Sequence, residues 1–233
     1  LRPITDSIPK ALVPIGERTM LEIVARRLID AGTQKLVINV HHHADQIRDV
    51  VRRCDSFGVD VVISDESDAL LDTGGGLAKA APVLTSSDPF LLHNVDVFSD
   101  VDLRRLTATH RELSPLASLV VNTRPSSRYL LFDDVGLVGY GNDATGLCEK
   151  ARPVVGVERR YSFCGIHAIS PRIFNLITEE GAFSIIALYM RLAGLGERIL
   201  PHPMLDHELW IDIGTPTELE RTREIARAQD RSS

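Results

Sequence analysis

Two aspartates follow apolar stretches at distant points of the chain. Asp96 comes two residues after "FLLHN" (Phe90–Asn94), and Asp212 lies inside "LWIDIGTP", directly before a glycine turn. Carboxylate oxygens suit Mg²⁺, which keeps waters and shares its coordination sphere with phosphates. Two carboxylates aimed at one crevice would repel each other unless a cation joined them. Taken singly, either aspartate also fits an ordinary turn or helix cap.

Two further stretches suggest contact with a phosphate-bearing ligand. "DTGGG" (Asp72–Gly76) has glycines that let the backbone approach a flat ligand, and it runs into a predicted helix whose N–H groups favour anions. It is neither a P-loop nor a GxGxxG motif, and a plain loop is the alternative reading. Lys10 lies between Pro9 and Pro14, where it fits either a phosphate contact or a solvated turn lysine.

The elements that must position these residues alternate along the chain. Apolar spacing predicts helices over residues 20–30, 44–53, 103–113 and 183–193, and two more starting at 171 and 216. Short apolar runs predict strands over 35–40, 60–64, 90–94, 117–121, 161–169 and 209–213. This alternation predicts an α/β fold with a Rossmann-like, mainly parallel sheet covered by helices on both faces. Such sheets bind ligands beyond the carboxyl ends of their strands, where both aspartates fall.

The segment 128–143, "RYLLFDDVGLVGYGND", departs from this alternation. It consists of short apolar runs joined by Gly and Asp turns, which are typical of hairpins. We therefore expect one domain over residues 1–233, with a small β insertion at 124–160 that serves as a lid or floor of the site.

The composition limits the possible partners. A net charge of −6 argues against broad nucleic-acid binding, which needs a basic face. No stretch approaches the roughly 20 apolar residues that span a membrane. The three cysteines, Cys54, Cys148 and Cys164, are far apart, which favours a reduced, cytoplasmic setting. The sequence gives no indication of the oligomeric state.

Taken together, these stretches resemble the sugar-1-phosphate nucleotidylyltransferases, the NTP_transferase type. That family has a signature G-x-G-T-R-L-x-P-L-T followed by P-K-x-L-x-P-[IV], and "LRPITDSIPKALVPI" resembles its second half. The other matching stretches are "LDTGGGLAKA", "HNVDVFSD", "CEK", "SFCGIHAISPRIF" and "LWIDIGTPTEL". The likeness covers nearly the whole chain. It is strongest to short members such as N-acetylmuramate-1-phosphate uridylyltransferases, followed by mannose-1-phosphate guanylyltransferases.

The resemblance implies a reaction and a catalytic set. A nucleotidyl group would pass from a nucleoside triphosphate, with UTP favoured, to a sugar-1-phosphate, and pyrophosphate would leave. Asp96 and Asp212 would hold Mg²⁺, Lys10 would contact the nucleotide or attacking phosphate, and Arg2 would face the β- and γ-phosphates. The chain would begin inside the nucleotide-binding motif, with the first strand and the glycine-rich half upstream.

The resemblance also implies residues that bind each substrate. The nucleotide would be contacted by Asp72, Thr73, Gly74, Gly75 and Asn94. On the sugar side, Glu149 and Gly165 would face hydroxyls, and Lys150 would contact the sugar phosphate. Two positions depart from the family pattern: Val95 stands where Gly or Ala is usual, and Ala151 replaces the Pro of E-K-P.

Other functions remain open at this stage. A GDP-mannose-type guanylyltransferase would use the same residues. A metal-dependent glycosyltransferase would use "DVFSD" (Asp96–Asp100), without releasing pyrophosphate. A regulatory homologue would bind nucleotide sugars without turnover. A cytidylyltransferase acting on phosphocholine would need an aromatic box, and aromatic residues make up only 5% of the chain.

Overall fold

The computed structural model describes residues 1, 4–41, 43–84 and 88–230. The chain divides into two compact units. The first unit comprises Leu1–Ala69, His93–Leu103 and His207–Ser233, and the second comprises Leu70–Leu92 and Arg104–Asp206. The expectation of one nucleotidyltransferase domain stays a prediction. No helix in the described ranges combines the length and the apolar character needed to span a membrane.

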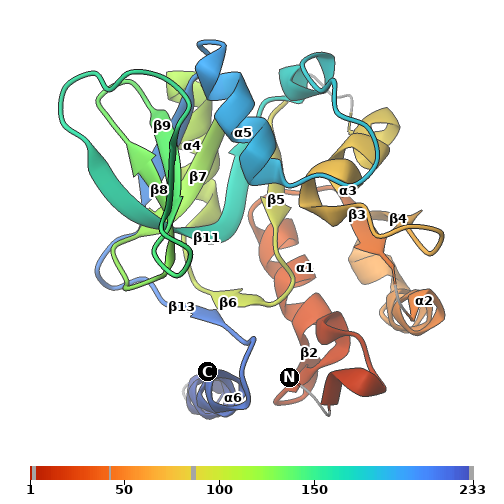
Figure 1. The fold of residues 1–233 in the computed structure, drawn as a ribbon. Coiled ribbons are helices and arrows are strands. Elements are labelled where there is room, and N and C mark those ends of the chain that lie inside the picture. Colours follow the sequence, from red (N-terminus) through yellow and green to blue (C-terminus); the bar gives the residue numbers. More distant parts are fainter. Residues whose placement is uncertain (2–3, 42, 85–87, 231–233) are drawn as a thin grey trace. The chain divides into compact units, whose positions relative to one another are not determined.

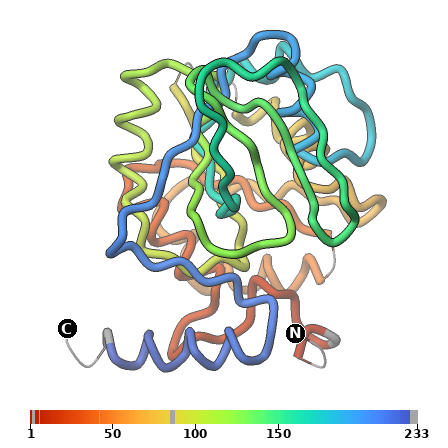
Figure 2. Tube along the Cα trace, turned by 60° about the vertical axis from the view of Figure 1, so that its left-hand side comes forward, coloured from red at the N-terminus to blue at the C-terminus, as the bar shows by residue number. Residues whose placement is uncertain are grey.

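The first unit contains the two termini and three strand pairs. Strands β3 and β4 run parallel, whereas β1–β2 and β6–β13 are antiparallel. Figure 2 shows the C-terminal helix in blue beside the N-terminal segment in red. The elements are η1 (Ile4–Asp6), η2 (Lys10–Leu12), β1 (Pro14–Ile15), β2 (Arg18–Thr19), α1 (Met20–Asp30), β3 (Lys35–Val40), α2 (Ala44–Arg53), η3 (Asp55–Gly58), β4 (Asp60–Asp65), β6 (Val97–Ser99), β13 (Trp210–Asp212) and α6 (Pro216–Asp230).

Local signals in the sequence explain the start of α1. Thr19 Oγ1 accepts a hydrogen bond from the Glu22 backbone N–H, and Glu22 Oε2 accepts one from the Thr19 N–H at 2.6 Å. This capping box satisfies N–H groups that the first helical turn leaves without partners. The apolar stripe Met20, Val24 and Leu28 then packs against the core that holds Val13 and Ile15. The predicted bounds of α1 and α2 are confirmed.

The second unit is built on one large sheet. Its strands follow the order β10-β9-β8-β11-β7-β12, and β5 also pairs with β11. Figure 1 shows β7, β8, β9 and β11 side by side. The elements are α3 (Asp72–Ala80), η4 (Ala81–Val83), β5 (Phe90–His93), α4 (Leu103–Leu113), β7 (Ala117–Asn122), β8 (Arg128–Phe132), β9 (Leu137–Asn142), β10 (Leu147–Lys150), β11 (Arg159–Ile169), η5 (Pro171–Asn175), α5 (Ile185–Gly194) and β12 (Ile199–Pro203).

The α/β class is confirmed, and the sheet is mixed. Strands β7 and β12 pair parallel, while β7–β11, β8–β11, β8–β9 and β9–β10 pair antiparallel. The expected short strands within 124–160 are present as β8, β9 and β10. They extend the main sheet, because β8 pairs antiparallel with β11 and β9 and β10 continue that pairing outward. Their role as a lid or floor stays a prediction.

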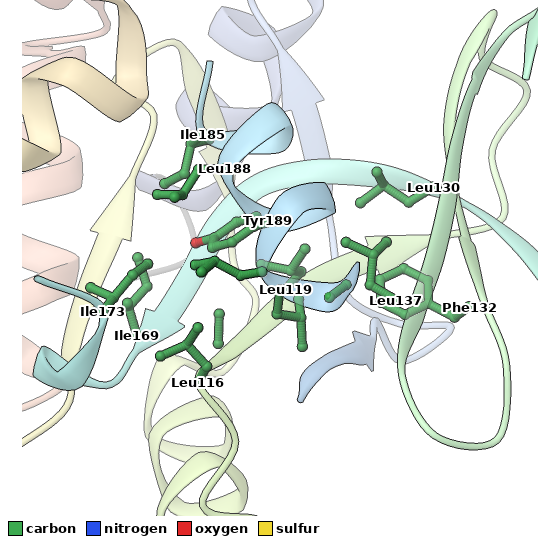
Figure 3. Packing of buried hydrophobic residues seen from close by; sticks show 14 of the residues in the cluster. Leu116, Leu119, Leu130, Phe132, Leu137, Ile169, Ile173, Ile185, Leu188 and Tyr189 are labelled. Carbon is green, nitrogen blue, oxygen red and sulfur yellow. The ribbon is translucent and has the colours of Figure 1, made fainter. Parts of the chain in front are cut away.

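The core of the second unit lies between α5 and the sheet. Side chains from α5, β7 and the β8–β9 hairpin converge there, with Tyr189 among them (Figure 3). The Tyr189 hydroxyl is buried and hydrogen-bonds His167 Nδ1 at 2.9 Å. Burial raises the pKa of Tyr189 well above its usual value, so the phenol stays neutral. The Tyr189 hydroxyl is thus accommodated inside the core by its hydrogen bond with His167 Nδ1.

The triple glycine differs from its sequence-based description. We expected a loop leading into a helix, but Gly74 and Gly75 lie within α3 itself. A Cβ atom on Gly75 would lie 2.3 Å from the Gly181 carbonyl oxygen, and one on Gly74 would lie 2.4 Å from the Phe183 ring. These glycines therefore allow segment 181–183 to pack directly on the helix, which outweighs their low helix propensity.

Smaller differences follow from local geometry. Ser170 does cap the next element, by accepting from the Arg172 N–H, but that element is the 3₁₀ turn η5. Helix α5 begins two residues later than expected, at Ile185, because Ser184 is its N-cap. Strands β6 and β12 were not expected. Each is short, and β12 contains prolines, which are uncommon inside strands.

A buried ion pair joins the β8–β9 turn to the segment after β10. Arg152 forms two hydrogen bonds of 2.7 Å with Asp133, whose side chain is 0% exposed. Backbone N–H groups of Val135, Gly136 and Val155 also donate to this carboxylate. The Arg152 guanidinium, with help from these N–H groups, holds the pKa of Asp133 far below its usual range.

We predict that Asp133→Asn lowers the free energy of unfolding by about 3 kcal/mol at pH 7, since it leaves the Arg152 guanidinium, whose side chain is 17% exposed, without a carboxylate partner. The folded-state pKa of Asp133 lies below the unfolded value of about 3.9. The stabilisation is therefore complete above that pH and is lost as pH falls toward the folded-state pKa. Urea unfolding at several pH values should show the gap between parent and variant narrowing on acidification.

Asp134→Asn is the matched control. Asp134 pairs with Arg159 at 3.0 Å, but both side chains are about half exposed, at 51% and 49%. An exposed pair contributes at most about 1 kcal/mol. A comparable loss of stability in both variants would contradict the role assigned to burial at Asp133.

Candidate functional site

An ion pair links the opening segment to the turn after β5. Lys10 is the first residue of η2, and its Nζ lies 3.1 Å from Asp96 Oδ2. The segment is held by backbone hydrogen bonds from Leu12 N–H to the Pro9 carbonyl and from Met20 N–H to the Val13 carbonyl. Val13 is fully buried, which anchors the turn in the core of the first unit. This ion pair is compatible with either expectation for Lys10, so its contact with a phosphate stays a prediction.

Strand pairing brings the two predicted metal ligands to neighbouring positions. Asp212 is the register partner of Val97 in the β6–β13 ladder, and the Ile213 N–H donates to the Asp96 carbonyl at 3.0 Å. Asp96 thus lies in the turn between β5 and β6, while Asp212 ends β13. The structure brings together Lys10, Asp96 and Asp212 from three distant parts of the sequence.

Each aspartate uses one carboxylate oxygen within the first unit. Asp96 Oδ2 accepts from Lys10, and Asp212 Oδ1 accepts from the Gly214 N–H at 2.8 Å. Within the described ranges, Asp96 Oδ1 and Asp212 Oδ2 have no hydrogen-bond partner. The Asp96 side chain is 27% exposed, and Asp212 is exposed. Two accessible, hard oxygen donors of like charge fit a divalent cation such as Mg²⁺.

The described residues offer no cluster of three or more His, Cys, Asp or Glu side chains suited to a metal ion. This is compatible with Mg²⁺, which is commonly held by one or two carboxylates and completes its shell with waters and substrate phosphates. The fit therefore rests on Asp96 and Asp212 alone, and the remaining ligands would come from the substrates.

Two partly buried side chains, Arg27 and His93, hydrogen-bond to backbone carbonyls on either side of Asp96 in the sequence. The Arg27 guanidinium donates from Nη2 to the Val101 carbonyl at 2.5 Å, and His93 Nδ1 lies 2.8 Å from the Asn94 carbonyl oxygen. Burial, with a smaller effect of the Arg27 charge, lowers the pKa of His93 to about 4. His93 is therefore neutral near pH 7, so Nδ1 donates its proton to the carbonyl that precedes Val95 and Asp96.

Asn94, which was expected to bind nucleotide, belongs to this same turn. Its carbonyl also accepts from the Val97 N–H at 3.2 Å. Val95, the departure from the family pattern, packs its side chain against the core formed by β3, α2 and Phe57. The larger side chain at this position is thus accommodated by apolar contacts. Arg2, the fourth residue of the expected catalytic set, lies outside the described residues.

Glu66, which follows β4, was not among the site residues predicted from the sequence. Glu66 is only 5% exposed, and its Oε1 has no hydrogen-bond partner in the part of the chain that the structure describes. Its backbone is fixed, since its N–H donates to the Val40 carbonyl at 2.6 Å. A carboxylate at the carboxyl end of a parallel strand is the same signal that identified Asp96, so the strand at 60–64 could have indicated it.

In the second unit, the predicted base-contacting residues mostly contact one another and Phe183. Asp72 has a positive φ of 57°, and its Oδ1 accepts from the Thr73 N–H at 2.6 Å. The N–H groups of Gly74 and Gly75 donate to the Phe183 carbonyl at 3.0 and 3.3 Å. Their hydrogen bonds are thus used in packing α3 against the segment before α5. A base contact by this segment stays a prediction.

The predicted sugar-side residues lie on separate strands of the large sheet. Glu149 and Lys150 are exposed on the edge strand β10, where Lys150 Nζ pairs with Glu158. Gly165 lies in β11, and β9 and β8 separate β10 from β11 in the strand order. Gly165 has a φ of 72° where the β11–β7 register shifts between Phe163 and His167, so a glycine suits this bulge. Their assignment to sugar binding stays a prediction.

Comparison with known proteins identifies similar sequences among nucleotidyltransferases. An N-acetylmuramate alpha-1-phosphate uridylyltransferase of Neisseria meningitidis serogroup B is 29% identical, over 98% of this chain and 94% of its own. A UTP–glucose-1-phosphate uridylyltransferase of Synechocystis is 26% identical, over 92% of this chain and 57% of its own. A mannose-1-phosphate guanylyltransferase catalytic subunit beta of Drosophila pseudoobscura is 27% identical, over 94% of this chain and 57% of its own.

Solved structures share the fold at low sequence identity. A putative glucose-1-phosphate thymidylyltransferase from Bacillus anthracis, in complex with a sucrose, matches with a TM-score of 0.77 and 16% identity, covering 97% of this chain and 90% of that one. A UDP-glucose pyrophosphorylase complexed with UDP-glucose matches with a TM-score of 0.76 and 11% identity, covering 98% and 94%. The nucleotidyl transferase family model matches residues 1–228. Over residues 1–228, therefore, this chain belongs to the nucleotidyl transferase family.

Proposed function

We propose that this protein transfers a nucleotidyl group from a nucleoside triphosphate to a sugar-1-phosphate. The products are a nucleoside diphosphate sugar and pyrophosphate. The observation that carries the proposal is the grouping of Lys10, Asp96 and Asp212 at one edge of the first unit. Family membership and the names of the relatives support it. The nucleoside triphosphate also favours a cytoplasmic setting.

The proposed chemistry depends on charge neutralisation. An oxygen of the sugar phosphate attacks the α-phosphorus and forms a new P–O bond, while the bond to the bridging oxygen of pyrophosphate breaks. The attacking phosphate is already ionised, so no strong general base is needed. Positioning and electrostatic stabilisation then supply the rate enhancement. Asp96 and Asp212 would hold Mg²⁺, which when bound supplies positive charge to the phosphates, and Lys10 adds a second positive charge.

UTP is the preferred nucleotide in this proposal, because relatives covered over most of their length are uridylyltransferases. A guanylyltransferase activity is the second candidate, favoured by the mannose-1-phosphate relatives. We infer that Glu66 contributes to base recognition. Its buried Oε1 lacks a partner among the described residues and is suited to accept an N–H of the base. Asp72 and Thr73 on α3, and Glu149 and Lys150 on β10, remain the proposed contacts of the second unit.

The first experiment is pyrophosphate release by the full-length protein with Mg²⁺, four nucleoside triphosphates and a panel of sugar-1-phosphates. We expect release only when one triphosphate and one sugar-1-phosphate are present together, because neither substrate alone completes the reaction. Reaction with UTP would support the uridylyltransferase hypothesis, and reaction with GTP would support the guanylyltransferase hypothesis. A folded protein that binds nucleotide yet releases no pyrophosphate with any pair would contradict the proposal and favour a regulatory homologue or a glycosyltransferase.

Removing either proposed metal ligand should reduce turnover. We expect Asp96→Asn and Asp212→Asn each to lower kcat/KM by about 100-fold or more, the scale seen when a charge-stabilising group is lost. Asp49→Asn is the control, since Asp49 is a 70% exposed carboxylate on α2 that pairs only with neighbouring Arg52 in the described chain. Activity of both variants within a few-fold of the parent would refute the metal-ligand assignment.

Glu66 can be tested by two substitutions. Glu66→Leu removes the acceptor, and we expect the KM for the preferred nucleotide to rise about 10-fold, the cost of one hydrogen bond to a charged group. Glu66→Gln keeps an acceptor oxygen and should retain more of the nucleotide affinity. The sugar-1-phosphate KM serves as the internal control. An equal rise in both KM values would contradict a role in base recognition.

A further inference from the structure

Lys10 holds the carboxylate that is proposed to bind metal. Its ammonium contacts Asp96 Oδ2 at 3.1 Å, so one of the two oxygens that Asp96 could offer to a cation already faces a positive charge. Among the described residues, Asp212 has no cationic partner, and its Oδ1 accepts from the neutral Gly214 N–H. Lys10 therefore supplies a positive charge to Asp96, one of the two proposed metal ligands.

We propose that Lys10 is a placeholder cation. A divalent cation that binds Asp96 and Asp212 displaces the ammonium from Asp96, and the freed ammonium becomes available to a substrate phosphate. This inference rests on the proposed function, since it assumes that the two aspartates bind metal and that Lys10 contacts phosphate. It adds that metal binding and phosphate binding are coupled through the Lys10–Asp96 ion pair, which the metal would break.

The energetics allow the exchange. Lys10 is 45% exposed and Asp96 is 27% exposed, and partly exposed pairs contribute only about 0–1 kcal/mol. The lysine stem is flexible, so the ammonium can move without moving the backbone. Once a dication lies against Asp96, it repels the ammonium, whereas nearby phosphates attract it. Because coupling is reciprocal, nucleotide phosphates that draw Lys10 away should in turn favour metal binding.

The fold does not depend on this ion pair to hold the segment in place. Val13 and Ile15, which follow η2, are buried in the core, at 0% and 2% exposure. Backbone hydrogen bonds close the turn around Lys10, including Leu12 N–H to the Pro9 carbonyl at 2.9 Å. The side chain can therefore be replaced, or can change partner, while the turn is retained.

The test measures two affinities separately in the full-length protein. Mn²⁺ binding is measured without nucleotide, by the loss of the free-ion electron paramagnetic resonance signal, and UTP binding is measured in EDTA. For Lys10→Met, we expect Mn²⁺ to bind about 5-fold more tightly, because about 1 kcal/mol of competition is removed. UTP should bind more weakly, because a phosphate contact is lost. Two changes of opposite sign are not expected from a structural defect.

Two variants serve as controls. Lys10→Arg keeps the charge and should bind Mn²⁺ with nearly the parent affinity. Lys35→Met removes another lysine that is 45% exposed and lies 3.1 Å from an aspartate, Asp60, on the β3–β4 pair. It should leave both affinities unchanged, since its partner belongs to neither substrate site. A similar gain in Mn²⁺ affinity in this control would indicate a general effect of net charge and overturn the inference.

Other outcomes also decide the question. Unchanged or weaker Mn²⁺ binding by Lys10→Met would overturn the exchange, as would Mn²⁺ binding that is undetectable in both parent and variant. The proposed function has its own readout, because pyrophosphate release by the parent does not depend on the outcome with Lys10→Met. Release together with an unchanged Mn²⁺ affinity would reject the placeholder role while leaving the nucleotidyl transfer intact.

Discussion

The pairing of β6 with β13 is the contact on which the candidate site of the first unit depends. It places Asp212 opposite Val97 and joins the Ile213 N–H to the Asp96 carbonyl. Asp96, just before β6, and Asp212, at the end of β13, are therefore brought to neighbouring positions, although nothing near either residue in the sequence requires it. Phe98 and Ile211 from the two strands are buried in the same core, and their packing holds the ladder in register.

Two carboxylates that are proposed to share one cation favour a positive charge nearby, and the fold provides one beside Asp96 from a third segment. The turn of η2 is closed by backbone hydrogen bonds and anchored by Val13, which leaves the Lys10 side chain partly exposed and beside Asp96. The surrounding polar groups are more firmly fixed: His93 is neutral, and it donates to the carbonyl just before the aspartate turn. A turn fixed by backbone hydrogen bonds, with one partly exposed lysine ammonium, suits the exchange proposed above.

In the second unit, the residues predicted to contact ligand include glycines that allow a close approach of backbone segments. Gly74 and Gly75 let residues 181–183 pack on α3, and their N–H groups are satisfied by the Phe183 carbonyl. Gly165 takes a left-handed conformation at the bulge in β11. The same glycines that suggested ligand contact thus have packing roles within this unit.

The sequence by itself determined the α/β class, the bounds of α1, α2 and α4, and the candidate residues Lys10, Asp96 and Asp212. Periodicity and capping are local properties, and the motif residues carry their chemistry with them. Only the tertiary structure decided which oxygen of Asp96 meets Lys10, that the glycines of α3 donate to Phe183, and that Glu66 is buried with a free acceptor among the described residues. Those outcomes depend on strand pairing and side-chain packing between segments far apart in the chain, which no local pattern encodes.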